Sequence, residues 1–214
     1  MVRFFRCVYV FATAFEFLQA TTLLALFAVA QSDQFRTSLW KDGGARGLNS
    51  DPGLRIYFYA NHREPPPVAL VWDESLTMSC LCFAVLTVFI WFLRYFVRRS
   101  IEDVYAMVFV NALYDAILAA LWAYSGISQN SGDFSDPEHL SPKPWFLERG
   151  CRTAGNISKT GCEVMNAAYG LTVLTIIWFC ARFLATCMYG AYLYGHEEES
   201  KKALFKREYV DLLI

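Results

Sequence analysis

Residues 104–127 read VYAMVFVNALYDAILAALWAYSGI, an apolar stretch of bilayer-spanning length that carries one carboxylate, Asp115, near its middle. A bilayer core of about 30 Å requires about 20 mostly apolar residues in helical form. Since lipid offers the backbone no hydrogen-bond partner, this stretch is expected to be an α-helix. A charge at mid-bilayer costs at least ~2.5–3.5 kcal/mol, so Asp115 is expected to be paired or functional.

Three further stretches have the same character, and each offers about 20 or more largely apolar residues: 8–30, 76–97 and 166–195. The chain of 214 residues is 56% hydrophobic, which is high for a soluble domain, and its net charge of −1 argues against nucleic-acid binding. We therefore predict an all-α membrane protein with four transmembrane helices in an antiparallel bundle.

The first apolar stretch also resembles a secretory signal peptide. Arg3 and Arg6 precede it, and Ala28-Val29-Ala30 resembles a cleavage site. Its apolar length, however, exceeds the usual range of about 7–15 residues, and Glu16 interrupts it. We expect this stretch to be retained as a transmembrane helix.

The distribution of basic residues predicts that both ends of the chain are cytosolic. Nine Lys and Arg residues lie in the N-terminus, the short turn at 94–103 and the tail: Arg3, Arg6, Arg94, Arg98, Arg99, Lys201, Lys202, Lys206 and Arg207. The loops 31–75 and 128–165 also hold nine, spread over more than twice the length. Because basic residues concentrate on the cytosolic side, we expect the two loops to be lumenal or extracellular. Residues 1–195 form the predicted transmembrane domain, and residues 196–214 form a cytosolic tail.

Two features of loop 128–165 favour the same orientation. Asn156-Ile157-Ser158 is a sequon for N-glycosylation, which occurs only on the lumenal side. Such a tripeptide also arises by chance, so unmodified Asn156 is the alternative. The sequon lies between Cys151 and Cys162, which an oxidising compartment would allow to form a disulfide.

Loop 31–75 is expected to contain a small β-ribbon. Residues 54–59 are rich in aromatic and branched side chains, which favour a strand, and Pro65-Pro66-Pro67 would end it before a second strand at 68–72. Three tryptophans of the loops are expected to anchor in the headgroup zone: Trp40, Trp72 and Trp145.

Three ionisable residues inside the apolar stretches fall at about the same depth. Glu16 lies about ten residues from the start of its helix, Asp115 about eleven, and Arg182 about twelve from the end of its helix, so all three come within about one turn of a common plane. Asn111 precedes Asp115 by four residues and shares its helix face. We expect Arg182 to pair with Asp115, Glu16 or both, and one carboxylate to be protonated because two surround a single arginine.

This intramembrane charge cluster has three interpretations. An ion cluster that specifies the bundle is favoured. The alternatives are a charge paired with a partner membrane protein, and a proton or ion path, since pumps also place carboxylates at mid-depth.

Three features of the apolar stretches form one pattern: the basic start of the first, Asp115 in the third, and Cys162 just before the small-residue opening Asn166-Ala167-Ala168-Tyr169-Gly170 of the fourth. In this pattern the chain resembles MARVEL-domain proteins, the group that includes physins, gyrins and fungal membrane-compartment proteins. The resemblance covers the transmembrane stretches and not loop 31–75. It implies membrane organisation and vesicle traffic rather than catalysis.

The ends of the chain carry candidate trafficking features. The tail sequence EYVDLL fits overlapping acidic-dileucine and tyrosine-based signals for clathrin adaptors, through Glu208, Tyr209, Leu212 and Leu213. A tail helix lying on a partner or on the membrane is the alternative. Cys7 is a candidate for palmitoylation, with an ordinary buried thiol as the alternative.

The predicted function is that of a non-catalytic membrane organiser, a trafficking tetraspan, or an accessory subunit of a larger membrane complex. The alternative is a small ion channel or a proton-linked transporter that uses Glu16, Asp115 and Arg182. Expected partners are lipids and either another integral membrane protein or further copies of this chain, in a eukaryotic plasma membrane or vesicle membrane. No cofactor or metal site is expected, since no Cys/His cluster has ligand spacing.

Overall fold

The structure is a computed structural model that describes the backbone of residues 2–31, 33–100 and 103–211, and the side chains of residues 10–31, 35–96, 103–152, 154–155 and 158–198. Four of its helices are long and apolar enough to cross a membrane: α1 (Val2–Ala30), α4 (Glu74–Ser100), α5 (Val104–Gln129) and α7 (Asn156–Asp211). The prediction of an all-helical chain with four potential membrane spans is therefore confirmed.

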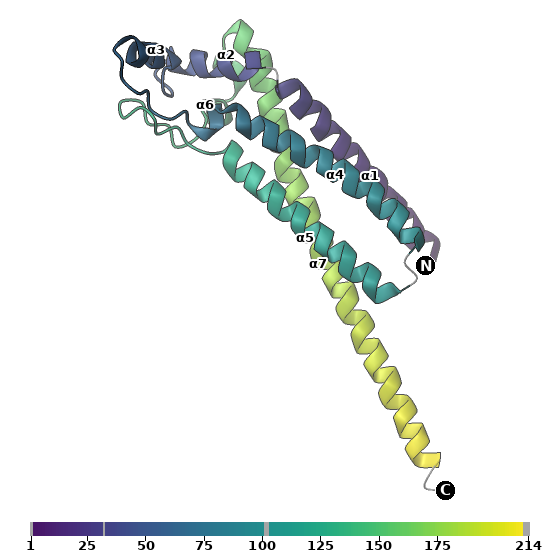
Figure 1. Ribbon diagram of the computed structural model, residues 1–214. Helices are drawn as coiled ribbons and strands as arrows, with labels where there is room; N and C mark the ends of the chain where they lie inside the picture. The colour runs from purple at the N-terminus through teal and green to yellow at the C-terminus, as the bar shows by residue number, and fades with distance from the viewer. Residues whose placement is uncertain (1, 32, 101–102, 212–214) are drawn as a thin grey trace.

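The four long helices lie alongside one another, and the short elements gather at one end (Figure 1). We call this the cap end, which holds α2 (Asp33–Gly44), α3 (Pro52–Ala60) and α6 (Trp145–Glu148). The opposite end, where residues 101–103 connect α4 to α5, is the turn end. The most extensive helix contacts join α5 to α7 and α1 to α4, so two helix pairs build the bundle.

Helix α7 is much longer than its neighbours and continues beyond them at the turn end (Figure 1). Its 56 residues correspond to about 84 Å at 1.5 Å per residue. It begins ten residues before the predicted stretch and runs without a break past residue 195. The predicted boundary between span and tail at residue 195 therefore falls inside one continuous helix. Just beyond this boundary α7 still contacts α5, since the Tyr105 hydroxyl donates to the Glu197 carboxylate.

The β-ribbon predicted in loop 31–75 was wrong, because the described residues form helices there. The first expected strand is α3. Asp51 caps this helix by accepting a hydrogen bond from the Gly53 backbone N–H at 2.8 Å, and Pro52 occupies its first turn. An Asp cap followed by proline is a strong helix start, and it outweighs the strand preference of the aromatic residues. The second expected strand contains a 3₁₀ turn at Leu70–Trp72.

The cap has its own core, and two of the tryptophans expected in the headgroup zone belong to it. Trp72 and Trp145 are buried, while Trp40 is half-buried and stacks on Trp72 with ring centroids 6.3 Å apart. The Trp72 indole N–H donates to the Asp133 carboxylate at 2.8 Å. Trp72 and Trp145 are therefore enclosed in the cap core, where their rings hold the cap together, and their depth relative to the headgroups stays a prediction.

Asp133 is the polar centre of this cap. Besides Trp72, its carboxylate accepts hydrogen bonds from the hydroxyls of Ser50 and Ser135, each at 2.6 Å, and from both their backbone N–H groups. Burial alone would raise the pKa of Asp133, but these hydrogen bonds outweigh it and lower the pKa. Asp133 is therefore an ionised group on which three segments of the cap converge.

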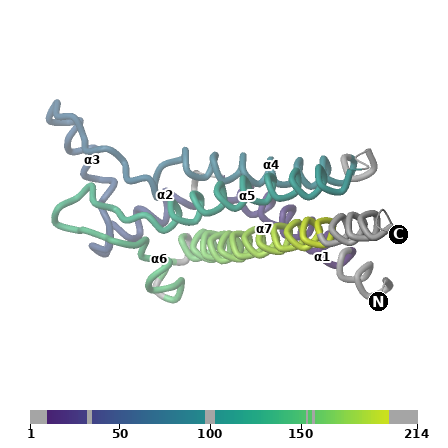
Figure 2. The backbone as a smooth tube through the Cα atoms, turned by 90° about the horizontal axis from the view of Figure 1, so that it is seen from below, coloured from purple at the N-terminus to yellow at the C-terminus, as the bar shows by residue number. Residues whose placement is uncertain are grey.

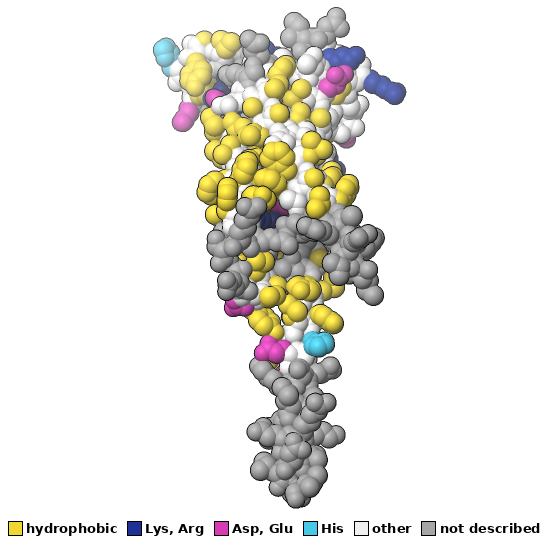
Figure 3. Space-filling model, turned by 90° about the vertical axis from the view of Figure 1, so that its right-hand side faces the viewer, with side chains coloured by type: hydrophobic (Ala, Val, Ile, Leu, Met, Phe, Trp, Pro, Cys, Tyr) yellow, Lys and Arg dark blue, Asp and Glu magenta, His cyan; other side chains and the backbone are white. Residues whose placement is uncertain are grey.

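A second core fills the space between the long helices. It includes Leu23 and Phe27 of α1, Leu118 and Trp122 of α5, and Phe179 of α7, all almost fully buried. Apolar side chains also cover much of the outer surface over the length of the long helices (Figure 3). An apolar exterior around a packed helical interior is what a lipid environment requires.

Candidate functional site

Four charged side chains meet between the long helices, and each comes from a different helix: Glu16 of α1, Arg94 of α4, Asp115 of α5 and Arg182 of α7. We call these four residues the charge ring. The structure thus brings together the three ionisable residues singled out in the sequence, and it adds Arg94.

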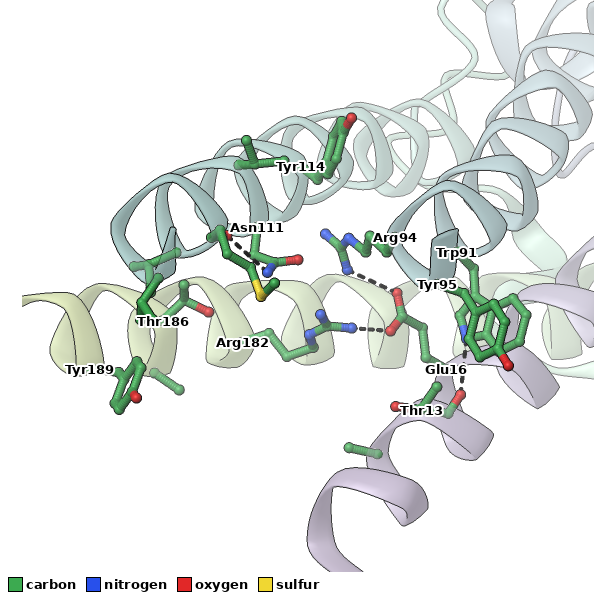
Figure 4. Close-up of a pocket in the computed structure, with 16 residues that line it drawn as sticks. Thr13, Glu16, Trp91, Arg94, Tyr95, Asn111, Tyr114, Arg182, Thr186 and Tyr189 are labelled. Atoms are coloured by element: carbon green, nitrogen blue, oxygen red, sulfur yellow. Dashed lines mark hydrogen bonds and ion pairs between the residues drawn. The ribbon is translucent and has the colours of Figure 1, made fainter. Parts of the chain in front are cut away.

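Acid and base alternate around the charge ring. Arg94 donates to Glu16 Oε1 at 3.1 Å and to Asp115 Oδ1 at 2.6 Å. Arg182 pairs with Glu16 through Nη1, and its Nε lies 3.7 Å from Asp115 Oδ2. Figure 4 shows the two guanidinium groups converging on the Glu16 carboxylate. Each carboxylate therefore bridges both arginines, and each arginine bridges both carboxylates.

The ring is formally neutral, because two carboxylates face two guanidinium groups. The expectation that two carboxylates surround a single arginine was wrong, because it left Arg94 out. Burial within the ring is uneven: the exposed fraction is 0% for the Asp115 side chain and 6% for Glu16, but 10% for Arg94 and 26% for Arg182. Asp115 is therefore the most enclosed member of the ring and Arg182 the most accessible one.

Arg94 was missed because it stands next to Arg98 and Arg99, and the three together resemble a cytosolic turn. In the structure, α4 continues to Ser100, so Arg94 lies six residues inside the helix, about 9 Å from its end. Without Arg94, the predicted cytosolic segments hold eight basic residues and the two loops hold nine. The cytosolic segments are still less than half as long as the loops, so the bias in basic residues remains. The predicted stretch 76–97 already extends past Arg94, and this length was the signal that could have placed Arg94 inside the helix.

Asn111 lies beside the charge ring without joining it. Its side-chain N–H donates to the Met107 carbonyl one turn earlier in α5, at 2.9 Å. It lines a cavity of about 680 Å³ between α1, α4, α5 and α7, together with Glu16, Arg94 and Arg182. Figure 4 shows these side chains around the cavity.

Neutral polar side chains occupy the bundle between the ring and the cap. The Gln19 side chain donates to the Thr175 hydroxyl at 2.6 Å, and the Trp122 indole donates to the Thr87 hydroxyl at 3.0 Å. Nearer the cap, Gln129 donates to the hydroxyls of Ser125 and Thr172 at 3.0 and 3.1 Å. All seven side chains are nearly or fully buried. Because lipid cannot satisfy such groups, these hydrogen bonds select how the helices pack.

The disulfide expected at the start of the last helix is present and joins Cys151 to Cys162. Cys162 is fully buried in the cap core. The Asn166 side chain, one turn further along α7, donates to the Phe146 carbonyl at 3.1 Å. The disulfide thus ties the segment before α7 to the cap.

The sequon lies at the first turn of α7. The side chain of Asn156 lies outside the described residues, whereas Ser158 is buried and donates to Asp42 and to the Gly155 carbonyl. Burial raises the pKa of Asp42, but hydrogen bonds from Ser158 and Gly155 and the charge of Arg46 outweigh it and lower the pKa. The side chains of Cys7, Glu208 and Tyr209, and all of Leu212 and Leu213, also lie outside the described residues.

Comparison with known proteins yields no relative for this chain. No protein-family model matches it, and neither does any curated protein or solved structure. The resemblance to MARVEL-domain proteins therefore stays a prediction from the residues.

Proposed function

We propose that this chain is a non-catalytic integral membrane protein that organises membrane in vesicle traffic or serves as an accessory subunit of a larger membrane complex. Its four long helices form an antiparallel transmembrane bundle. The turn end, with both chain termini, faces the cytosol, and the cap end faces the lumen or the cell exterior. Basic residues near the turn end and the sequon and disulfide at the cap end support this orientation.

The observation that carries the proposal is the closure of the charge ring. The four charges pair with one another, and each of the four long helices contributes one. Removing one member of a buried ion pair typically costs about 3–5 kcal/mol, so the ring penalises any arrangement in which one helix shifts or leaves. This is the behaviour of a scaffold that holds a fixed shape for other molecules to contact.

Helix α3 supports a role in binding a partner. It has no buried residue, and its exposed apolar side chains include Ile56 at 74%, Tyr57 at 60% and Tyr59 at 63% exposure. Figures 1 and 2 both show α3 at the outer edge of the cap, away from the long helices. Aromatic side chains are enriched in protein interfaces, so α3 is a natural contact surface for the lumenal part of another membrane protein.

Purification from its native membrane in mild detergent, followed by mass spectrometry, tests this function. We expect a stoichiometric membrane-protein partner that is lost when Ile56→Asp and Tyr59→Asp are combined. Leu140→Asp is the matched control, because Leu140 is an exposed apolar residue of the cap outside α3. Recovery of the chain alone, or of a complex indifferent to the α3 changes, would count against the accessory role.

A small channel or proton-linked transporter is the second candidate. The cavity reaches the charge ring, and the polar side chains of Gln19, Thr175 and Gln129 continue from the ring toward the cap. Proton flux into liposomes holding the purified chain tests this function. A flux that Asp115→Asn abolishes would establish transport and replace the scaffold proposal.

A further inference from the structure

We propose that the cavity beside the charge ring binds an amphiphile with an anionic head, a carboxylate or a phosphate, and one apolar tail. The inference requires the long helices to be embedded in lipid, and it does not depend on any partner protein. It therefore stands or falls separately from the accessory role.

The part of the charge ring that lines the cavity holds both arginines and one carboxylate. The cavity is lined by Arg94, Arg182 and Glu16, while Asp115 is fully enclosed. Arg182 is the most exposed member, with 26% of its side chain accessible, against 6% for Glu16. A ligand that enters the cavity therefore meets the Arg182 side chain as the most accessible part of the ring.

One hydrogen-bond donor of the charge ring is unused within the described residues. The Arg94 side chain is nine-tenths buried, and its two terminal nitrogens bond to Glu16 and Asp115. Its Nε is buried with no acceptor. A buried unpaired donor costs about 1–3 kcal/mol, and oxyanions match the guanidinium fork. The ring also holds one acceptor without a hydrogen-bond partner, Asp115 Oδ2, but Asp115 does not line the cavity. Since the ring is formally neutral, the single unused Arg94 N–H and the partly exposed Arg182 side chain, rather than net charge, recognise the head.

The rest of the cavity suits a hydrocarbon tail. Ala12, Val104, Val108 and Ala185 contribute apolar wall from three helices. Figure 3 shows acidic and basic atoms at the bottom of a hollow in the apolar surface, so the charges are accessible from the side of the bundle. A volume of about 680 Å³ lies within the range of about 300–1,000 Å³ typical of small-molecule sites. The geometry therefore places the head at the charge ring and the tail along the walls, toward lipid.

Photolabelling in lipid nanodiscs tests the site. The full chain in phosphatidylcholine is irradiated with palmitate carrying a diazirine in its tail, and the adducts are mapped by mass spectrometry. We expect adducts on the cavity walls of α1, α5 and α7. Ala185→Trp fills the cavity without replacing a member of the ring and should reduce labelling at least tenfold. Ala191→Trp is the matched control, because Ala191 is exposed on the opposite face of α7 and should leave labelling unchanged.

Competition defines the head. Palmitate and lysophosphatidate should displace the probe, whereas hexadecanol should not. Stronger displacement by palmitate would identify a free fatty acid as the ligand, and stronger displacement by lysophosphatidate a phospholipid-type head. If Ala185→Trp fails to fold, Ala12→Phe fills the cavity from α1 instead. Labelling of a folded cavity-filled variant at the parent level, or displacement by hexadecanol as effective as by palmitate, would overturn the proposal.

Discussion

Every charge in the ring has two partners, so the loss of one side chain leaves two groups underpaired. Without Arg94, Glu16 and Asp115 would share Arg182 alone among the described residues. Its position six residues inside α4 makes it as integral to the ring as the three residues visible in the sequence.

The first prediction concerns how many charges must be removed together. Arg94→Leu or Arg182→Leu alone should lower the free energy of unfolding by about 3–5 kcal/mol. Replacing Glu16, Asp115 and Arg182 by Leu should remain destabilising, because Arg94 is then an unpaired buried charge, and adding Arg94→Leu should recover much of the loss. Thermal unfolding in detergent compares the variants, with the exposed Arg63→Leu as control. A triple variant as stable as the quadruple one would show that Arg94 lies outside the ring.

The second prediction concerns acid and the cap. Because the pKa of Asp133 is lowered in the folded protein, its stabilising effect is complete above its unfolded pKa of about 3.9 and is lost as the pH falls through the folded value. The cap should therefore be stable at pH 5–7 and weaken below about pH 4. Asp133→Asn should cost roughly 1.5–3 kcal/mol at neutral pH and reduce the acid dependence.

Tryptophan fluorescence during an acid titration measures this effect, since Trp72 donates to Asp133. Asp42 and Asp136 also have lowered pKa values, Asp136 through its hydrogen bond with His139, so a smaller acid transition should persist in the variant. An unchanged acid transition in Asp133→Asn would contradict the assignment of Asp133 as the centre of the cap.

At the scale of the element, the start of α7 makes its contacts with the cap. Asn166 and Cys162 both face the segment before the helix, and Ser158 packs on α2 through Asp42. The helix therefore begins well before its apolar stretch, because the cap supplies the partners that its first turns need.

The third prediction concerns this junction. Replacing Cys151 and Cys162 together by Ser should lower stability by about 2–4 kcal/mol and detach the start of α7 from the cap. The melting temperature with and without a reductant measures the effect: the parent should respond to the reductant and the double Ser variant should not. Cys82→Ser, at an exposed free thiol of α4, should melt like the parent. Equal melting of the double Ser variant and the parent would show that the cap holds α7 without the disulfide.

At the scale of the whole molecule, the two ends differ in chemistry. The turn end collects both termini and the connection between α4 and α5, while the cap end collects the disulfide and the sequon (Figure 1). The proposed topology places the cap end, with its disulfide, on the oxidising side of the membrane.

The fourth prediction concerns that orientation. In sealed microsomes, added protease should remove a tag at the C-terminus and leave the cap intact. A glycan at Asn156 should be lost in Asn156→Gln, with a corresponding shift on a gel. Because Ser158 is buried in the folded cap, the glycan must be transferred before the cap folds. A tag protected from protease would reverse the proposed topology.

The sequence by itself determined the four long helices, the pairing of Cys151 with Cys162 and the meeting of Glu16, Asp115 and Arg182. The length of an apolar stretch, the spacing of two cysteines and the position of a residue along a helix can all be counted directly in the sequence. The Asp51-Pro52 start of α3 was also a local signal, which the strand preference of the aromatic residues concealed. Only the tertiary structure decided that Arg94 completes the charge ring and that Trp72 and Trp145 are buried. Both depend on which partners the fold brings within reach: two carboxylates for an arginine near a helix end, and Asp133 and the Leu39 carbonyl for the two indole N–H groups.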